Sequence, residues 1–201
     1  MKSVEARIKA RIRHAPPGWI MTNRDFADCG SSDAVDVALF RLKRKSVVRG
    51  LARGLFDKPV FNKLLGEFLA PDVRAVAEAV ARKNQWHIQP AGALALNAIG
   101  LDTQIPVQPV FLSDGPTKTF RLYDGTVLRF RHRTLRESKF RDTRSEILVQ
   151  ALKAAGDLSD PSVAGAVRRF VPPQDRASIL ADTRFAPAAV HDFLKRVFAH
   201  P

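Results

Sequence analysis

Apolar side chains at every fourth position indicate the first helix of this chain. Val4, Ile8 and Ile12 form one stripe behind Ser3, whose hydroxyl can cap the helix. The run Pro16–Pro17–Gly18 ends it, because proline lacks the amide hydrogen that a helix interior requires. The pattern therefore predicts an amphipathic helix that buries one side.

A short extended run and a second, shorter helix follow. Residues 19–21 (Trp-Ile-Met) are apolar and extended, and Thr22 or Asn23 can cap a helix over residues 24–28 that stops before Gly30. Such a helix would present its N-terminus, with Thr22 and Asn23, to a phosphate.

A third helix is predicted to begin at Ser31 or Ser32. Its buried stripe is made of three residues: Val35, Leu39 and Leu42. Its opposite side is made of four polar residues: Asp36, Arg41, Lys43 and Arg44. The second helix of a helix-turn-helix pair enters the major groove of DNA, and this helix occupies that place in the order of elements.

A hairpin closes the first segment. β-forming residues at 47–49 and 55–56 flank the turn 50–54, which holds two glycines. The order helix, strand, helix, helix, hairpin predicts a winged helix-turn-helix over residues 1–58. Arg49 and Arg53 would lie on the wing.

The remainder, residues 59–201, is predicted to be a second domain that is mixed α/β over 71–140 and helical over 141–201. Residues 58–70 resemble a linker, but its large apolar residues are expected to pack on the next element: Phe61, Leu64, Leu65, Phe68 and Leu69. Further elements follow from apolar periodicity and turn residues: a helix over 71–84, a helix over 89–97, a strand over 107–112, and helices over 146–155, 161–171, 174–183 and 187–199. The predicted fold class is α+β.

Alternating strands at 119–123 and 126–132 surround Asp124–Gly125 and give the strongest hairpin signal in the chain. On the second strand, Arg129, Arg131 and Arg133 share one face. That face fits a second nucleic-acid surface or an ordinary solvated one.

Charge changes this picture because it is concentrated in two segments. The 201 residues include 33 Lys or Arg and 20 Asp or Glu, for a net charge of +13. Residues 1–53 carry +7 and residues 118–144 carry +6, whereas residues 54–117 carry −1 and residues 145–201 carry +1, so two segments hold the whole excess. Localised positive charge is typical of a polyanion partner, and it favours double-stranded DNA here.

The winged-helix interpretation predicts which polar residues of the third helix and the wing contact DNA. We expect four residues to face the groove: Ser31, Ser32, Asp36 and Arg41. We expect four to contact the backbone or the minor groove: Lys43, Arg44, Arg49 and Arg53. A palindromic operator would be bound by a homodimer, whereas an operator of repeated sites could be bound by monomers.

Several segments together resemble the AbiEi-type antitoxins of type IV toxin–antitoxin systems. The segments that carry the resemblance are 18–22 (GWIMT), 25–26 (DF), 34–42 (AVDVALFRL), 48–57 (VRGLARGLFD), 71–72 (PD), 88–95 (IQPAGALA) and 113–116 (SDGP). It covers roughly residues 3–135, with Phe56 where the family more often has tyrosine. The resemblance implies a bacterial repressor that binds its own promoter and counteracts a nucleotidyltransferase toxin encoded beside it.

Signals for catalysis, cofactors or metals are weak. Cys29 lies at the end of the short second helix and is expected to be buried and inert, and the five histidines show no metal-ligand spacing. No phosphate-binding glycine loop is present. A magnesium-dependent nuclease built on Asp124, Glu137 and Lys139 remains an alternative to a chain without enzymatic activity.

The sequence therefore predicts a DNA-binding antitoxin that regulates its own operon. A winged-helix transcriptional regulator without a toxin partner, and an interaction scaffold that binds no DNA, stay open beside it. No apolar run approaches the roughly 18 residues that a membrane span requires. The N-terminus lacks the apolar region of a secretory signal, so a cytoplasmic location is expected.

Overall fold

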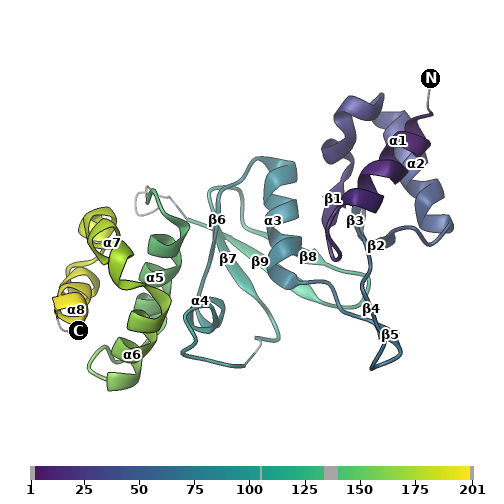
Figure 1. Ribbon diagram of the computed structural model, residues 1–201. Coiled ribbons are helices and arrows are strands. Elements are labelled where there is room, and N and C mark those ends of the chain that lie inside the picture. The colour runs from purple at the N-terminus through teal and green to yellow at the C-terminus, as the bar shows by residue number, and fades with distance from the viewer. Residues whose placement is uncertain (1–2, 105, 134–139, 200–201) are drawn as a thin grey trace. The chain divides into compact units, whose positions relative to one another are not determined.

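The protein folds into two compact units in a computed structural model that describes residues 3–104, 106–133 and 140–199 (Figure 1). The first unit contains residues 1–86 and 120–126, and the second contains residues 87–119 and 127–201. The architecture is α+β, as the sequence predicts. None of the described helices is long and apolar enough to cross a membrane.

The first unit begins with the elements of a winged helix-turn-helix in the predicted order. They are α1 (Val4–His14), β1 (Ile20–Thr22), a 3-10 segment (Asn23–Cys29), α2 (Ser32–Arg44), β2 (Arg49–Ala52) and β3 (Leu55–Asp57). The three strands form one antiparallel sheet in the order β1-β3-β2. The predicted stripes of α1 and α2 are buried together in one core with Met21 and Phe26.

The first unit continues well past residue 58. Residues 58–70 are not a linker, because they form a hairpin from β4 (Phe61–Asn62) and β5 (Glu67–Phe68). The expectation that their large apolar side chains pack on the next element is wrong, since these side chains are exposed. Helix α3 (Val73–Asn84) follows, and it is capped by Asp72, so Pro71 lies before the cap and not at the first helical position. Arg82 of α3 forms an ion pair with Asp25, and this contact helps to place α3 in the same unit as the winged helix.

The second unit contains most of a four-stranded sheet. Its strands are β6 (Ile88–Pro90), β7 (Val110–Ser113), β8 (Lys118–Arg121) and β9 (Val127–His132), in the order β6-β7-β9-β8. β8 begins in the second unit and ends in the first. The prediction of a helix that starts at Gln89 is wrong, because residues 88–90 form a strand paired with β7. Gly92, at φ +56°, then turns the chain, and the helix α4 (Ala93–Ala98) begins after it.

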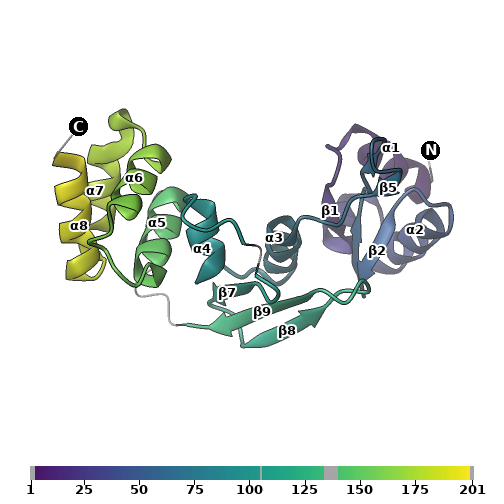
Figure 2. The same ribbon diagram turned by 90° about the horizontal axis from the view of Figure 1, so that it is seen from below.

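Helices complete the second unit, as predicted for the C-terminal part. They are α5 (Thr143–Ala154), α6 (Pro161–Phe170), α7 (Arg176–Asp182) and α8 (Ala188–Ala199). α5 is buried along most of its length, and Leu148, Val167, Ile179 and Leu194 are among the residues of the shared core. Both views of the ribbon show these four helices gathered side by side, with α4 next to α5 (Figures 1 and 2).

Candidate nucleic-acid interface

Helix α2 presents one side to solvent because its other side is fixed in the core. The Ser31 hydroxyl caps the helix by accepting the Ala34 amide hydrogen at 3.4 Å, and Val35, Leu39 and Leu42 are buried. Residues 33, 37, 40 and 44 follow at helical spacing on the side away from that core. Val37 is 48% exposed and Phe40 58%, so apolar surface lies among the charges.

The predicted groove residues of α2 are exposed. Ser32, Asp36 and Arg41 lie on the solvent side, and Ser31 is exposed at the cap. Arg44, predicted to contact the backbone or the minor groove, is exposed as well. Neither Arg41 nor Arg44 forms an ion pair with any residue that the structure describes. The first turns of α2 carry carboxylates and its last turn carries the cations, so the helix has a polar gradient along its outer side.

Lys43 lies between α2 and the wing. Its ammonium nitrogen is 5.4 Å from the centroid of the Tyr123 ring, and its side chain passes beside Gly50 of β2. Tyr123 is held there because its amide hydrogen bonds the carbonyl oxygen of Leu51 at 2.8 Å. A cation over an aromatic face keeps its charge and remains available to a phosphate. Sequence reasoning did not find Tyr123, because the contact joins segments far apart in the chain.

The tip of the wing carries two cations from different elements. Gly54 makes the turn at φ +68°, and Arg53 before it is exposed. A Cβ atom built on Gly54 would lie only 2.8 Å from the ammonium nitrogen of Lys83, so the end of α3 lies against this turn. Lys83 thus adds to the charge of Arg53. The sequence did not indicate this, since Lys83 lies in a segment of net charge −1.

Arg49 is not placed as predicted, because a buried carboxylate binds it. Its guanidinium donates to both carboxylate oxygens of Asp57, at 2.5 and 3.1 Å, and Asp57 is 1% exposed. The hydrogen bonds to Asp57 raise the pKa of Arg49. The structure therefore assigns Arg49 to the framework of the wing, and Arg53 is the wing arginine that remains open to an anion.

The helix N-terminus at Thr22 and Asn23 is also occupied. Thr22 is buried, and the Asp25 carboxylate accepts both its amide hydrogen at 2.7 Å and its hydroxyl at 3.1 Å. Burial raises the pKa of Asp25, but the hydrogen bonds from Arg82 and Thr22 lower this pKa by more than burial raises it. The net shift of the pKa is therefore downward. A carboxylate already at this position leaves no place for a phosphate, which corrects the expectation for Thr22 and Asn23.

The second predicted surface is present as an exposed row on β9. Arg129, Arg131 and Arg133 are exposed, while Leu128 and Phe130 on the other face are buried. The alternation follows the predicted faces. β9 belongs to the second unit.

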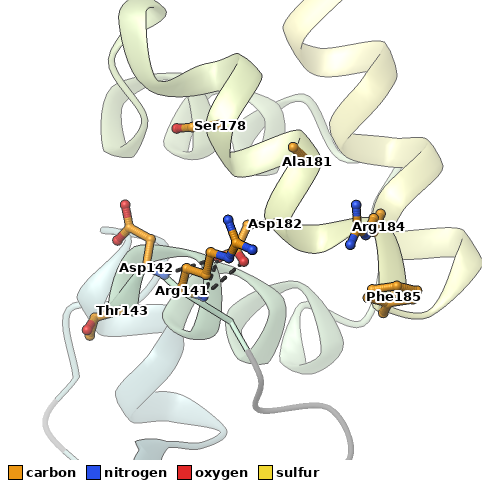
Figure 3. A pocket seen from close by; sticks show the side chains of 8 residues that line it. All are labelled: Arg141, Asp142, Thr143, Ser178, Ala181, Asp182, Arg184 and Phe185. Atoms are coloured by element: carbon orange, nitrogen blue, oxygen red, sulfur yellow. Dashed lines mark hydrogen bonds between the residues drawn. The ribbon is translucent and has the colours of Figure 1, made fainter.

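A pocket of about 670 Å³ in the second unit lies where α5 begins, beside α7 (Figure 3). The Asp182 carboxylate accepts the backbone amide hydrogens of Arg141 and Asp142. Arg144 in turn pairs with Asp142 at 2.8 Å and with Asp175 at 2.6 Å. The carboxylates beside this pocket therefore already bind backbone amides at the start of α5 or the guanidinium of Arg144.

Among the described residues, those considered for catalysis are not brought together in one site. Cys29 is buried in the core of the winged helix, as expected. Asp124 is exposed on its turn, while Glu137 and Lys139 lie outside the described residues. Across residues 3–104, 106–133 and 140–199, no three His, Cys, Asp or Glu side chains are grouped to hold a metal ion.

Residues 7–165 match a family described as "Family of unknown function (DUF6088)". The chain belongs to this family. The match begins in α1 and ends in α6, so sequence from both units of this DUF6088 protein lies within it. No curated protein matches the chain.

One solved structure is similar to this DUF6088 protein, the "Crystal structure of RV2827C protein from Mycobacterium tuberculosis". The identity is 16% and the TM-score is 0.46, over 98% of this chain and 76% of that one.

Proposed function

We propose that this DUF6088 protein is a DNA-binding antitoxin that represses its own operon and counteracts a nucleotidyltransferase toxin. The observation that carries the DNA-binding part is a set of arginines on α2 and the wing that form no ion pair within the first unit. Arg11, Arg49 and Arg82 are each paired with a carboxylate, whereas Arg41, Arg44 and Arg53 form no ion pair with described residues. Those three arginines lie on α2 and the wing, the two elements that a winged helix offers to DNA, whereas Arg13 and Arg24, which also form no ion pair with described residues, lie on α1 and the 3-10 segment.

The chemistry of α2 supports base readout as well as phosphate contact. Asp36 can accept a hydrogen bond from the amino group of cytosine, and Phe40 offers apolar surface to a thymine methyl group. Arg41, Lys43 and Arg44 follow in the last turns of the helix, where they can meet the phosphate backbone. Acidic and apolar residues ahead of a basic end favour a sequence-specific binder over a general polyanion binder.

The antitoxin part of the proposal is supported by the residues that resemble AbiEi-type antitoxins. A winged-helix regulator without a toxin partner is the second candidate, because the structural observations support DNA binding and do not bear on a toxin. The proposed DNA partner is the protein's own promoter, bound at repeated sites by a monomer or a homodimer, in the cytoplasm.

The test is a titration of the full chain against its own upstream duplex and an unrelated duplex of equal length. It is done without Mg²⁺ at two salt concentrations. We expect tighter binding to the upstream duplex, with both affinities falling as salt rises. Equal affinity for both duplexes would contradict sequence-specific repression, and absence of binding at low salt would contradict the DNA partner altogether.

Two further arms separate the alternatives. Expression of the neighbouring gene should arrest growth, and co-expression of this chain should relieve the arrest. If expression of the neighbouring gene does not affect growth, the second candidate, a regulator without a toxin partner, is favoured. Addition of Mg²⁺ should leave the duplex intact. Cleavage that Glu137→Ala abolishes would instead establish the nuclease.

A further inference from the structure

The hairpin of β4 and β5 exposes an unusual amount of apolar surface. Five large apolar residues lie on it, and we call them the hairpin patch: Phe61 (52% exposed), Leu64 (97%), Leu65 (63%), Phe68 (58%) and Leu69 (40%). Hairpin turns are usually built from Gly, Asn, Asp, Pro and Ser. Two leucines at the tip of a turn therefore need an explanation beyond the turn itself.

Hydrogen bonds fix the backbone that carries these side chains, and one ring contact joins two of them. The Asn62 side-chain oxygen accepts the amide hydrogens of Leu64 at 2.9 Å and Leu65 at 3.3 Å, and Gly66 closes the turn at φ +70°. Phe61 and Phe68 are directly cross-strand, with ring centroids 5.3 Å apart. The backbone of the patch and its two rings are thus pre-organised, which lowers the entropy lost when a partner covers them.

An isolated two-stranded hairpin is marginally stable in water, and contiguous exposed apolar patches of this kind mark protein interfaces. Aromatic side chains bury roughly 150–250 Å² each, so the five residues offer on the order of 500 Å² in each copy. Two copies would bury on the order of 1,000 Å², the size at which specific interfaces separate from adventitious contacts. The area is therefore sufficient for a self-interface.

The charges beside the hairpin patch point to a second copy of this chain as the partner. Lys63 and Glu67 lie on opposite arms of the turn, and both are exposed. Neither forms an ion pair with a residue in the described parts of the chain. A two-fold interface requires a surface that is complementary to itself, and an apolar centre with one cation and one anion at its edge has that property.

We propose that the hairpin patch is a homodimer interface. Two copies pair about a two-fold axis, with Leu64 and Leu65 at the centre and Lys63 of each copy facing Glu67 of the other. The dimer itself is independent of any DNA. Its use, which rests on the proposed function, is to bring two winged helices to two half-sites.

The first experiment measures self-association of the full chain without DNA. Sedimentation velocity from about 1 to about 100 μM should show a monomer–dimer equilibrium. The double variant Leu64→Ser/Leu65→Ser should lose the dimer. Both leucines are more than half exposed, so the change removes little packing, and an unchanged circular dichroism spectrum checks the fold. Val107→Ser, at a residue that is 92% exposed in the second unit, is the matched control and should dimerise normally.

Charge reversal separates a homodimer from binding to any other partner. Lys63→Glu alone and Glu67→Lys alone each place like charges together twice, and each should weaken dimerisation by on the order of tenfold. An equimolar mixture of the two variants should restore it, because opposite charges then meet at both contacts. A dimer that persists in Leu64→Ser/Leu65→Ser, or a chain that stays monomeric throughout, would overturn the proposal. Loss of DNA binding with the dimer intact would contradict only the proposed function.

Discussion

Arg49 and Asp57 lie opposite each other on the antiparallel strands β2 and β3, and two hydrogen bonds join the guanidinium to the carboxylate. Asp57 is 1% exposed, so its charge depends on this one partner. We expect Arg49→Ala to lower the free energy of unfolding by about 2–3 kcal/mol, as measured by urea denaturation. Adding Asp57→Asn should recover part of the loss, because it removes the unpaired charge.

Arg53 and Lys83 should behave differently from Arg49, because they lie at the tip of the wing and form no ion pair with a described residue. Arg53→Ala should weaken binding to all DNA sequences and lower the slope of log affinity against log salt by about 1. Lys83→Ala should do the same. Arg196→Ala, at an exposed residue of α8, is the matched control and should change neither quantity. An unchanged slope in Arg53→Ala would show that the wing does not contact phosphate.

The two serines at the start of α2 should separate stability from recognition. The Ser31 hydroxyl caps the helix, so Ser31→Ala should lower the free energy of unfolding by about 1 kcal/mol, while Ser31→Asn should keep most of it. Ser32 makes no hydrogen bond to a described residue through its hydroxyl. Ser32→Ala should therefore leave the thermal midpoint within error and change the preferred base in a duplex panel. If Ser31→Ala shifted base preference without loss of stability, Ser31 would contact DNA.

The pair of Asp25 and Arg82 predicts a pH dependence of stability. Because the folded state lowers the pKa of Asp25 below its usual 3.8, the ionised carboxylate stabilises the protein above that pH, and the contribution is lost as the pH falls. Arg82 is half exposed, so Arg82→Ala should cost about 1 kcal/mol near pH 7. This difference from the wild type should shrink toward pH 2, where only the hydrogen bond from Arg82 to the Ile20 carbonyl oxygen remains, as measured by urea denaturation at each pH. A difference that is constant with pH would contradict the ion pair.

Glu146 predicts the opposite pH dependence in the second unit. Burial raises the pKa of this carboxyl, which is 2.9 Å from the Nε2 atom of His87, although the charge and hydrogen bond of His87 act against the increase. A raised pKa favours the folded state at low pH, and this contribution is lost as the pH rises from about 4.5 through the folded pKa. Glu146→Gln should therefore gain stability relative to the wild type as the pH rises through that window. A gain that instead grows toward low pH would show that the ionised carboxylate is favoured in the fold.

Sequence periodicity was sufficient for elements whose burial depends on their own stripe, such as α1 with Ile8 and Ile12. It failed at Gln89, because the three residues of β6 acquire their structure from pairing with β7, more than twenty positions away. The residues of the candidate site likewise fall into those that local periodicity predicts and those that depend on contacts with other strands or helices. Exposure of Arg41 followed from its helical position, whereas the pairing of Arg49 depends on the hairpin register, which is shifted by an irregularity between Gly50 and Ala52. The approach of Lys83 to the wing is a tertiary contact that no local pattern contains.

Residues 120–126 belong to the first unit, although residues 87–119 of the second come before them in the chain. Tyr123, which bonds the wing at Leu51, is therefore encoded downstream of a part of the other unit. No single breakpoint in the gene separates two complete units, so recombination at one site cannot transfer the first unit to another protein intact. A substitution at Tyr123, in the turn between β8 and β9, would therefore act directly on the contacts of Leu51 and Lys43 in the winged helix.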